Sequence, residues 1–208
     1  MPRTDLSVPF AEKDDAKRLG ARWDAERKLW FVPEGVDLAV FDRWLPTEPE
    51  ITIRSPRYFI AQTEKDCWSC GRRTDVLGFI LPEGHECLEP DEDDEDEDKS
   101  VWVPMDCPTI VHYVRVLLPE VAVRAQALNP RYRVDFSQTI QASYWMNHCE
   151  HCEMKQGDFE MYSEPQGAFF PLCEDDAALI TLHEIAEPFG CDASAALGEM
   201  FIDAMQRP

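Results

Sequence analysis

Two short stretches, Cys67-Trp68-Ser69-Cys70-Gly71 and Cys149-Glu150-His151-Cys152, carry the strongest structural signal in this chain. Each places two cysteines three positions apart, which is the spacing of a zinc knuckle, a tight turn that directs two thiolates at one metal ion. Two knuckles together supply a closed tetrahedral shell, so the sequence predicts one structural zinc ion bound by Cys67, Cys70, Cys149 and Cys152. Gly71 suits this prediction, because the chain that curls under the metal needs a residue tolerant of positive φ.

The gap between the two knuckles is long. Seventy-eight residues lie between Cys70 and Cys149, whereas an uninterrupted ribbon has about 15–20. The sequence therefore predicts a split zinc ribbon with a large insertion between its two hairpins. Each knuckle needs flanking strands, and apolar β-forming segments supply them at 51–53, 58–61, 76–81, 144–146 and 159–162.

Three alternatives compete with a four-cysteine shell. A redox dithiol normally begins a helix after a buried strand, and neither pair has that context. Eight cysteines are an even number and allow disulfides, but the chain begins without a secretory signal, so we expect a reducing, cytoplasmic location. The third alternative replaces one cysteine by His148 or His151, and the spacing leaves it open.

The remaining segments between and after the knuckles combine helix, strand and loop. An acidic loop is expected at 82–100 and a strand at 101–103. Residues 109–128 are predicted to be helical because apolar residues recur near every 3.6 positions, with Pro119 kinking this helix or starting a second one. Apolar residues four apart predict a last helix over 193–205.

The first 46 residues read as a separate small α/β module. A strand precedes a helix that ends at Gly20, two strands follow, and a helix over 38–45 closes the unit. We therefore predict an α+β protein with a module at 1–46, a linker at 47–50 and a mixed domain at 51–208 that contains the split ribbon.

The module resembles a small domain of uncharacterised function found in conjugative-plasmid primases and mobile-element proteins. The resemblance rests on Val8-Pro9-Phe10-Ala11-Glu12-Lys13-Asp14, on Ala16-Lys17-Arg18-Leu19-Gly20-Ala21-Arg22-Trp23-Asp24, and on Lys28-Leu29-Trp30-Phe31-Val32-Pro33. It covers about a fifth of the chain, implies a nucleic-acid or mobile-element setting, and carries over no catalytic residue. The remainder resembles uncharacterised bacterial zinc-ribbon proteins, which implies no activity.

Cations in the module make nucleic acid a candidate ligand. Lys17, Arg18 and Arg22 can line one side of the helix and its following turn, close to Trp23 and Trp30. In the alternative interpretation the two tryptophans anchor the core and the cations form a solvated face. The module has no net positive charge, which favours this alternative.

The net charge of −21 lies almost entirely in the second part of the chain. Residues 47–208 contain 12 Lys/Arg and 32 Asp/Glu, a net charge of −20. Such a body repels phosphate backbones and attracts basic proteins. Eight of these charges form one run, which is either a solvated loop or a partner-binding mimic of a polyphosphate: Asp91, Glu92, Asp93, Asp94, Glu95, Asp96, Glu97 and Asp98.

Motifs for catalysis are broken or missing in the sequence. His183-Glu184 resembles half of a zinc-protease helix, but Glu187 stands where the second histidine is required. The remaining cysteines are expected to be buried, inert thiols: Cys87, Cys107, Cys173 and Cys191. We therefore do not expect an enzyme, and no apolar run reaches the length of a membrane span.

These observations favour a non-catalytic, zinc-stabilised acidic protein that binds a basic protein. Its sharpest form is an inhibitor or immunity-type protein that neutralises a nucleic-acid-acting toxin or enzyme. The alternative is a nucleic-acid-associated accessory protein of a mobile element, which uses the N-terminal module or a face of the ribbon.

Overall fold

The computed structural model describes residues 3–25, 27, 29–45, 50–91, 100–165, 167–197 and 201–208. The chain divides into two compact units, Met1–Pro49 and Glu50–Pro208. Both combine sheets with short helices, so the predicted α+β class is confirmed.

The first unit is a three-stranded antiparallel sheet of order β1-β3-β2, with helical turns packed on it. Phe41 and Trp44 are its largest fully buried side chains, and Trp44 Nε1 donates a 2.7 Å hydrogen bond to Glu12 Oε2. The closing helix predicted at 38–45 is a 3-10 helix. The elements are β1 Thr4–Leu6, η1 Phe10–Glu12, α1 Lys13–Arg18, β2 Arg22–Asp24, β3 Leu29–Val32 and η2 Leu38–Trp44.

The second unit is built on an eight-stranded sheet of order β13-β5-β6-β9-β14-β4-β7-β8. The neighbouring strands pair antiparallel throughout. The strands are β4 Ile53–Ser55, β5 Tyr58–Asp66, β6 Arg73–Leu81, β7 Glu86–Pro90, β8 Ser100–Pro104, β9 Thr109–Leu117, β13 Thr181–Ile185 and β14 Phe189–Leu197.

Both faces of this sheet are buried at its centre. Successive residues of a strand point to opposite faces, and in β5 the side chains of Tyr58 and Ile60 join one core while Phe59 and Ala61 join another. Helix α2, Pro119–Leu128, packs in the first core. The short helices α3, Asp158–Tyr162, and α4, Glu174–Ala177, contribute to the second, together with η3, Ile202–Ala204, near the C-terminus.

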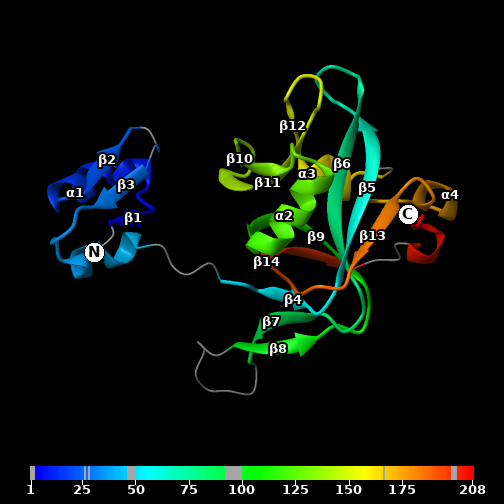
Figure 1. The fold of residues 1–208 in the computed structure, drawn as a ribbon, viewed down its shortest axis with the longest axis horizontal. Helices are drawn as coiled ribbons and strands as arrows, with labels where there is room; N and C mark the ends of the chain where they lie inside the picture. Colours follow the sequence, from blue (N-terminus) through cyan, green and yellow to red (C-terminus); the bar gives the residue numbers. More distant parts are fainter. Residues whose placement is uncertain are drawn as a thin grey trace. The chain divides into compact units, whose positions relative to one another are not determined.

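A second, three-stranded sheet of order β10-β11-β12 lies beside the large one. Its strands are β10 Arg133–Ser137, β11 Ala142–His148 and β12 Lys155–Gln156. Asn147 joins the two sheets, because its amide accepts the Leu77 N–H at 2.9 Å and donates to the Leu77 carbonyl at 2.8 Å. As a result the β11–β12 tip lies alongside the tip of the β5–β6 hairpin (Figure 1).

The prediction of a helix over residues 109–128 is wrong for its first half. Thr109–Leu117 form the central strand β9, and the helix begins only at Pro119, which occupies a first-turn position as the sequence allowed. A strand covered on both faces is apolar without strict alternation, so its apolar run can imitate helical spacing.

Three further expectations are corrected. The strand predicted at 159–162 is helix α3, and the strand after the second knuckle is the two-residue β12. The helix predicted over 193–205 is strand β14 followed by the short helix η3, because β14 pairs with β9 and β4. The segment predicted as a loop at 82–100 contains strand β7, which pairs with β8. The strand predicted at 101–103 is confirmed as part of β8, and residues 92–99 lie outside the described residues.

Candidate metal centre and binding surfaces

The two hairpin tips bring together the four cysteines of the knuckles. Cys67 and Cys70 lie between β5 and β6, and Cys149 and Cys152 lie between β11 and β12. All four sulfur atoms lie within 4.8 Å of one another, with 3.7 Å between Cys67 and Cys152 and 3.8 Å between Cys70 and Cys149. Thiolates placed tetrahedrally about 2.3 Å from a zinc ion are about 3.8 Å apart. The cluster therefore has the dimensions of a four-thiolate metal shell.

The two knuckles have the same local conformation. In each, the amide of the first cysteine donates to the carbonyl five residues later at 2.9 Å. The residue after the second cysteine donates back to the first, Gly71 to Cys67 at 2.8 Å and Glu153 to Cys149 at 3.0 Å. Both returning residues have positive φ, +69° at Gly71 and +59° at Glu153. The sequence anticipated this at the glycine, whereas Glu153 adopts it against its own preference.

Hydrogen bonds favour thiolates in the shell. Burial acts to raise the pKa of Cys67, but hydrogen bonds from the backbone N–H groups of Cys70 and Ser69 and from the neighbouring thiols together lower this pKa to about 6. Gln156 Nε2 also donates to Cys67 Sγ at 3.3 Å. At Cys152 a backbone N–H from Met154 lowers the pKa, but burial and the three other thiols raise it to about 12. A bound cation relieves that repulsion, so the donor set fits a thiolate-binding metal ion.

Neither candidate histidine belongs to the shell. His148 is buried, and its ring nitrogens lie 2.9 Å from the Arg131 carbonyl and 3.0 Å from Asp135 Oδ2. His151 Nε2 lies 2.8 Å from the Arg73 carbonyl. Both imidazoles therefore contact other polar groups, and the cluster consists of the four cysteines.

The other sequence candidates lie apart from this cluster. His183 is on strand β13, where Nε2 lies 3.0 Å from Gln62 Oε1, so no protease-type helix exists there. Cys191 is buried and burial raises its thiol pKa, as it does at Cys87. Cys173 is exposed, contrary to the expectation of a buried thiol. Of the acidic run 91–98, only Asp91 is among the described residues.

The three cations proposed for nucleic acid, Lys17, Arg18 and Arg22, are exposed on the first unit. Arg18 forms an ion pair with Asp15 on the same helix. No ion pair of Lys17 or Arg22 occurs within the described residues. The three side chains are therefore available to solvent, although they come from separate points along the helix and the following strand.

An aromatic groove of about 380 Å³ opens on the same unit. Trp23 is 51% and Phe10 81% exposed, so the interpretation of Trp23 as a core anchor is wrong. Trp30 is partly buried and packs against the core. The aromatic groove is lined by Leu6, Val8, Phe10, Lys13, Trp23, Leu29 and Trp30.

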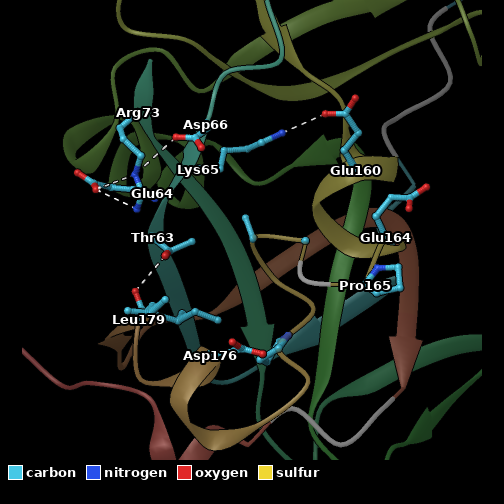
Figure 2. A pocket seen from close by; sticks show the side chains of 14 residues that line it. Thr63, Glu64, Lys65, Asp66, Arg73, Glu160, Glu164, Pro165, Asp176 and Leu179 are labelled. Atoms are coloured by element: carbon cyan, nitrogen blue, oxygen red, sulfur yellow. Dashed lines mark hydrogen bonds and ion pairs between the residues drawn. The ribbon is translucent and has the colours of Figure 1, made fainter. Parts of the chain in front are cut away.

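An acidic cavity of about 580 Å³ lies on the second unit (Figure 2). Its two cations already have partners: Lys65 Nζ is 3.1 Å from Glu160, and Arg73 contacts Glu64 at 3.2 Å and Asp66 at 4.0 Å. The carboxylates that line it outnumber these cations: Glu64, Asp66, Glu160, Glu164 and Asp176.

Residues 3–46 match a family described as a domain of unknown function, DUF5710. Two proteins from Escherichia coli, both described as DNA primase TraC, are 57% and 52% identical to this chain over 42 residues. These matches cover 20% of this chain and only 4% and 3% of the two primases. The predicted resemblance of the N-terminal module is therefore confirmed, and it reaches no further than the first unit. No solved structure matches the chain.

In the described part of the chain, no helix combines the length and the apolar character that a membrane span requires.

Proposed function

We propose that this protein is a non-catalytic binding protein, stabilised by a structural zinc ion, whose acidic second unit docks on a basic protein. The observation that carries the proposal is the charge of residues 47–208, which contain 12 Lys/Arg and 32 Asp/Glu. Nine of those cations are already held in ion pairs within the unit. The excess negative charge is therefore left for a partner or for solvent.

Zinc is the metal that the donor set favours. Four thiolates at tetrahedral spacing select soft or borderline ions, and zinc is the usual occupant of such sites. A shell of four cysteines leaves no open coordination position for a substrate, so the metal supports the fold rather than a reaction. A reducing compartment such as the cytoplasm suits these thiolates.

The acidic cavity supports a cationic partner. A lysine or arginine side chain from another protein would find several carboxylates there, and both cations among the described lining residues are already paired. Electrostatic attraction of this kind raises association rates by about 10- to 1,000-fold and weakens steeply with salt.

The finer form of the proposal is an inhibitor or immunity-type protein. Enzymes and toxins that act on nucleic acid carry basic grooves, and an acidic body can occupy such a groove in place of phosphates. The similarity of the first unit to part of a conjugative DNA primase supports a mobile-element setting for that role.

The test begins with zinc-loaded full-length protein as bait in native-host lysate treated with nuclease. Each captured protein is purified and its affinity measured at low and physiological salt. The control exchanges a carboxylate of the first unit that is also exposed, Glu34→Gln, for comparison with Glu164→Gln in the acidic cavity. The proposal is supported by a basic partner whose affinity falls as salt is raised. Its affinity should also fall for Glu164→Gln but not for Glu34→Gln. Binding that ignores salt, or that disappears with nuclease, contradicts it.

A second candidate function is nucleic-acid association through the first unit. It is favoured by the exposed rings of Trp23 and Phe10, which line one groove together with Lys13. The similarity of this unit to a segment of a DNA primase also favours it. In this case residues 1–46 contact DNA or RNA, and the acidic second unit limits access to it.

A further inference from the structure

The aromatic groove is built by a row of residues across the small sheet. In the antiparallel register Leu6 lies opposite Trp30, and Trp30 lies opposite Trp23. Residues that lie directly opposite each other share one face of a sheet. Leu6 is buried at the covered end of this row, and Trp23 is half-exposed at the open end. The two indole rings have centroids 5.6 Å apart at an interplanar angle of 60°.

Phe10 and Lys13 also line the groove. Phe10 stands at the start of η1 and is 81% exposed, which leaves one ring face free of protein. Lys13 Nζ lies 3.7 Å from the centre of the Phe10 ring, a cation–π contact that keeps the ammonium at the rim of the groove. A ligand that enters therefore meets aromatic surfaces and one positive charge.

The charge of the groove is opposite to that of the chain. Among the described residues that line it, Lys13 is the only ionisable one. The carboxylates of the same sheet, Asp5 and Asp24, are not among the residues that line the groove, and they contact Arg3 at 3.3 Å and 2.7 Å. In a protein of net charge −21, a groove with aromatic walls and a single ammonium is suited to an aromatic ligand that carries negative charge.

We propose that the aromatic groove binds an unpaired base of single-stranded nucleic acid, with Trp23 and Phe10 as stacking surfaces and Lys13 beside the adjoining phosphate. This inference rests on the second candidate function and specifies its site. An unpaired base offers both ring faces for stacking, whereas a duplex hides them. A basic peptide is disfavoured because its cations would meet Lys13 and, among the described lining residues, no carboxylate.

Two of the three cations identified in the sequence gain a role from this placement. Lys17 and Arg22 are exposed and without ion pairs in the described part of the chain, so they can hold phosphates farther along the strand. Those contacts add affinity without selecting single strands, because phosphates are present in both forms. Selection of single strands depends on the groove.

The test uses the zinc-loaded full-length protein and fluorescently labelled oligothymidine, with a duplex of the same length as competitor. Affinity is measured by anisotropy for the wild type, Trp23→Ala, Phe10→Ala and Lys13→Gln. The matched control is Phe159→Ala, which removes a ring that is 58% exposed on the second unit. Because Trp23→Ala can also loosen the first unit, Trp23→Phe is included to retain stacking while changing the side chain.

We expect the wild type to prefer the single strand to the duplex. Loss of one stacking ring should weaken binding about 5- to 150-fold, and Trp23→Phe should restore most of it. Lys13→Gln should lower the slope of log affinity against log salt by about 0.7, the value for one phosphate contact on a single strand. Phe159→Ala should bind as the wild type does.

Two results overturn the inference in different ways. If oligothymidine binds but the groove variants bind it as tightly as the wild type, the groove is not the site, although nucleic-acid association stands. If the wild type binds neither strand form at low salt, the groove proposal and the second candidate function fail together.

Discussion

Replacing Asp158 by asparagine should change how the stability of the second unit depends on pH. Asp158 begins α3 and is 4% exposed, and its Oδ2 accepts the Tyr113 N–H at 2.6 Å. Tyr113 has a φ of +51° where β9 bulges against β14, so its amide is not used in the sheet ladder. Burial raises the pKa of Asp158 to about 7, although the Tyr113 N–H acts to lower it.

The sign of the effect follows from proton binding. In the unfolded chain this carboxyl has a pKa near 3.8, against about 7 when folded. Between these values the folded state holds a proton that the unfolded state has released, so stability falls as pH rises and levels off above pH 7. A shift of about three pKa units corresponds to about 4 kcal/mol in total, of which about 2–3 kcal/mol is lost between pH 5 and pH 8.

Asparagine keeps an oxygen for the Tyr113 amide but has no charge to desolvate. We therefore expect the free energy of unfolding of Asp158→Asn, relative to that of the wild type, to increase by about 2–3 kcal/mol as the pH rises from 5 to 8. Urea denaturation with zinc present, followed by circular dichroism at each pH, measures this difference. Burial also raises the pKa values of Tyr113, Tyr144 and Tyr162, so these phenols stay neutral across the window.

Asp192→Asn is the matched control. A hydrogen bond from Arg115 lowers the pKa of Asp192, so its contribution to stability is complete above its unfolded value of 3.8 and is lost only at more acidic pH. The control should differ from the wild type by a constant amount between pH 5 and pH 8. If the stability of Asp158→Asn runs parallel to that of the wild type across the same range, the reasoning about Asp158 is refuted.

Three other changes test the ribbon. Gly71→Ala should cost about 1–2 kcal/mol through positive φ alone, since no atom lies within 4 Å of the added Cβ; Gly157→Ala, equally open but at φ −74°, should cost less in the same melt, and equal costs would contradict the argument. Asn147→Ala should cost about 2–5 kcal/mol by leaving two buried backbone groups of β6 unpaired; a loss below 1 kcal/mol in urea denaturation would argue against this bridge. Cys149→Ser should abolish stoichiometric zinc in elemental analysis and lower the melting temperature, whereas Cys173→Ser should do neither; full zinc in the first variant would exclude the shared shell.

Local chemistry in the sequence was sufficient for the knuckles and for the class of the fold. A Cys-x-x-Cys spacing with a following glycine specifies a turn by itself, because the constraint involves only a few neighbouring residues. Pro119 likewise marked the start of α2. The aromatic and glycine landmarks of the first unit were equally local, and they identified its relationship to the primase segment.

Tertiary structure decided what local patterns could not distinguish. Thr109–Leu117 and the segment after Phe189 became neighbouring strands because each is buried between partners distant in sequence, which removes the alternation that would have marked them. The four sulfurs meet where the side chain of Asn147 hydrogen-bonds the backbone of Leu77 in β6, a residue 70 positions earlier in the sequence. Trp23 is exposed rather than central because Phe41 and Trp44 fill the core. The sequence contains every one of these side chains, but only packing determines which of them remain at the surface to bind a ligand.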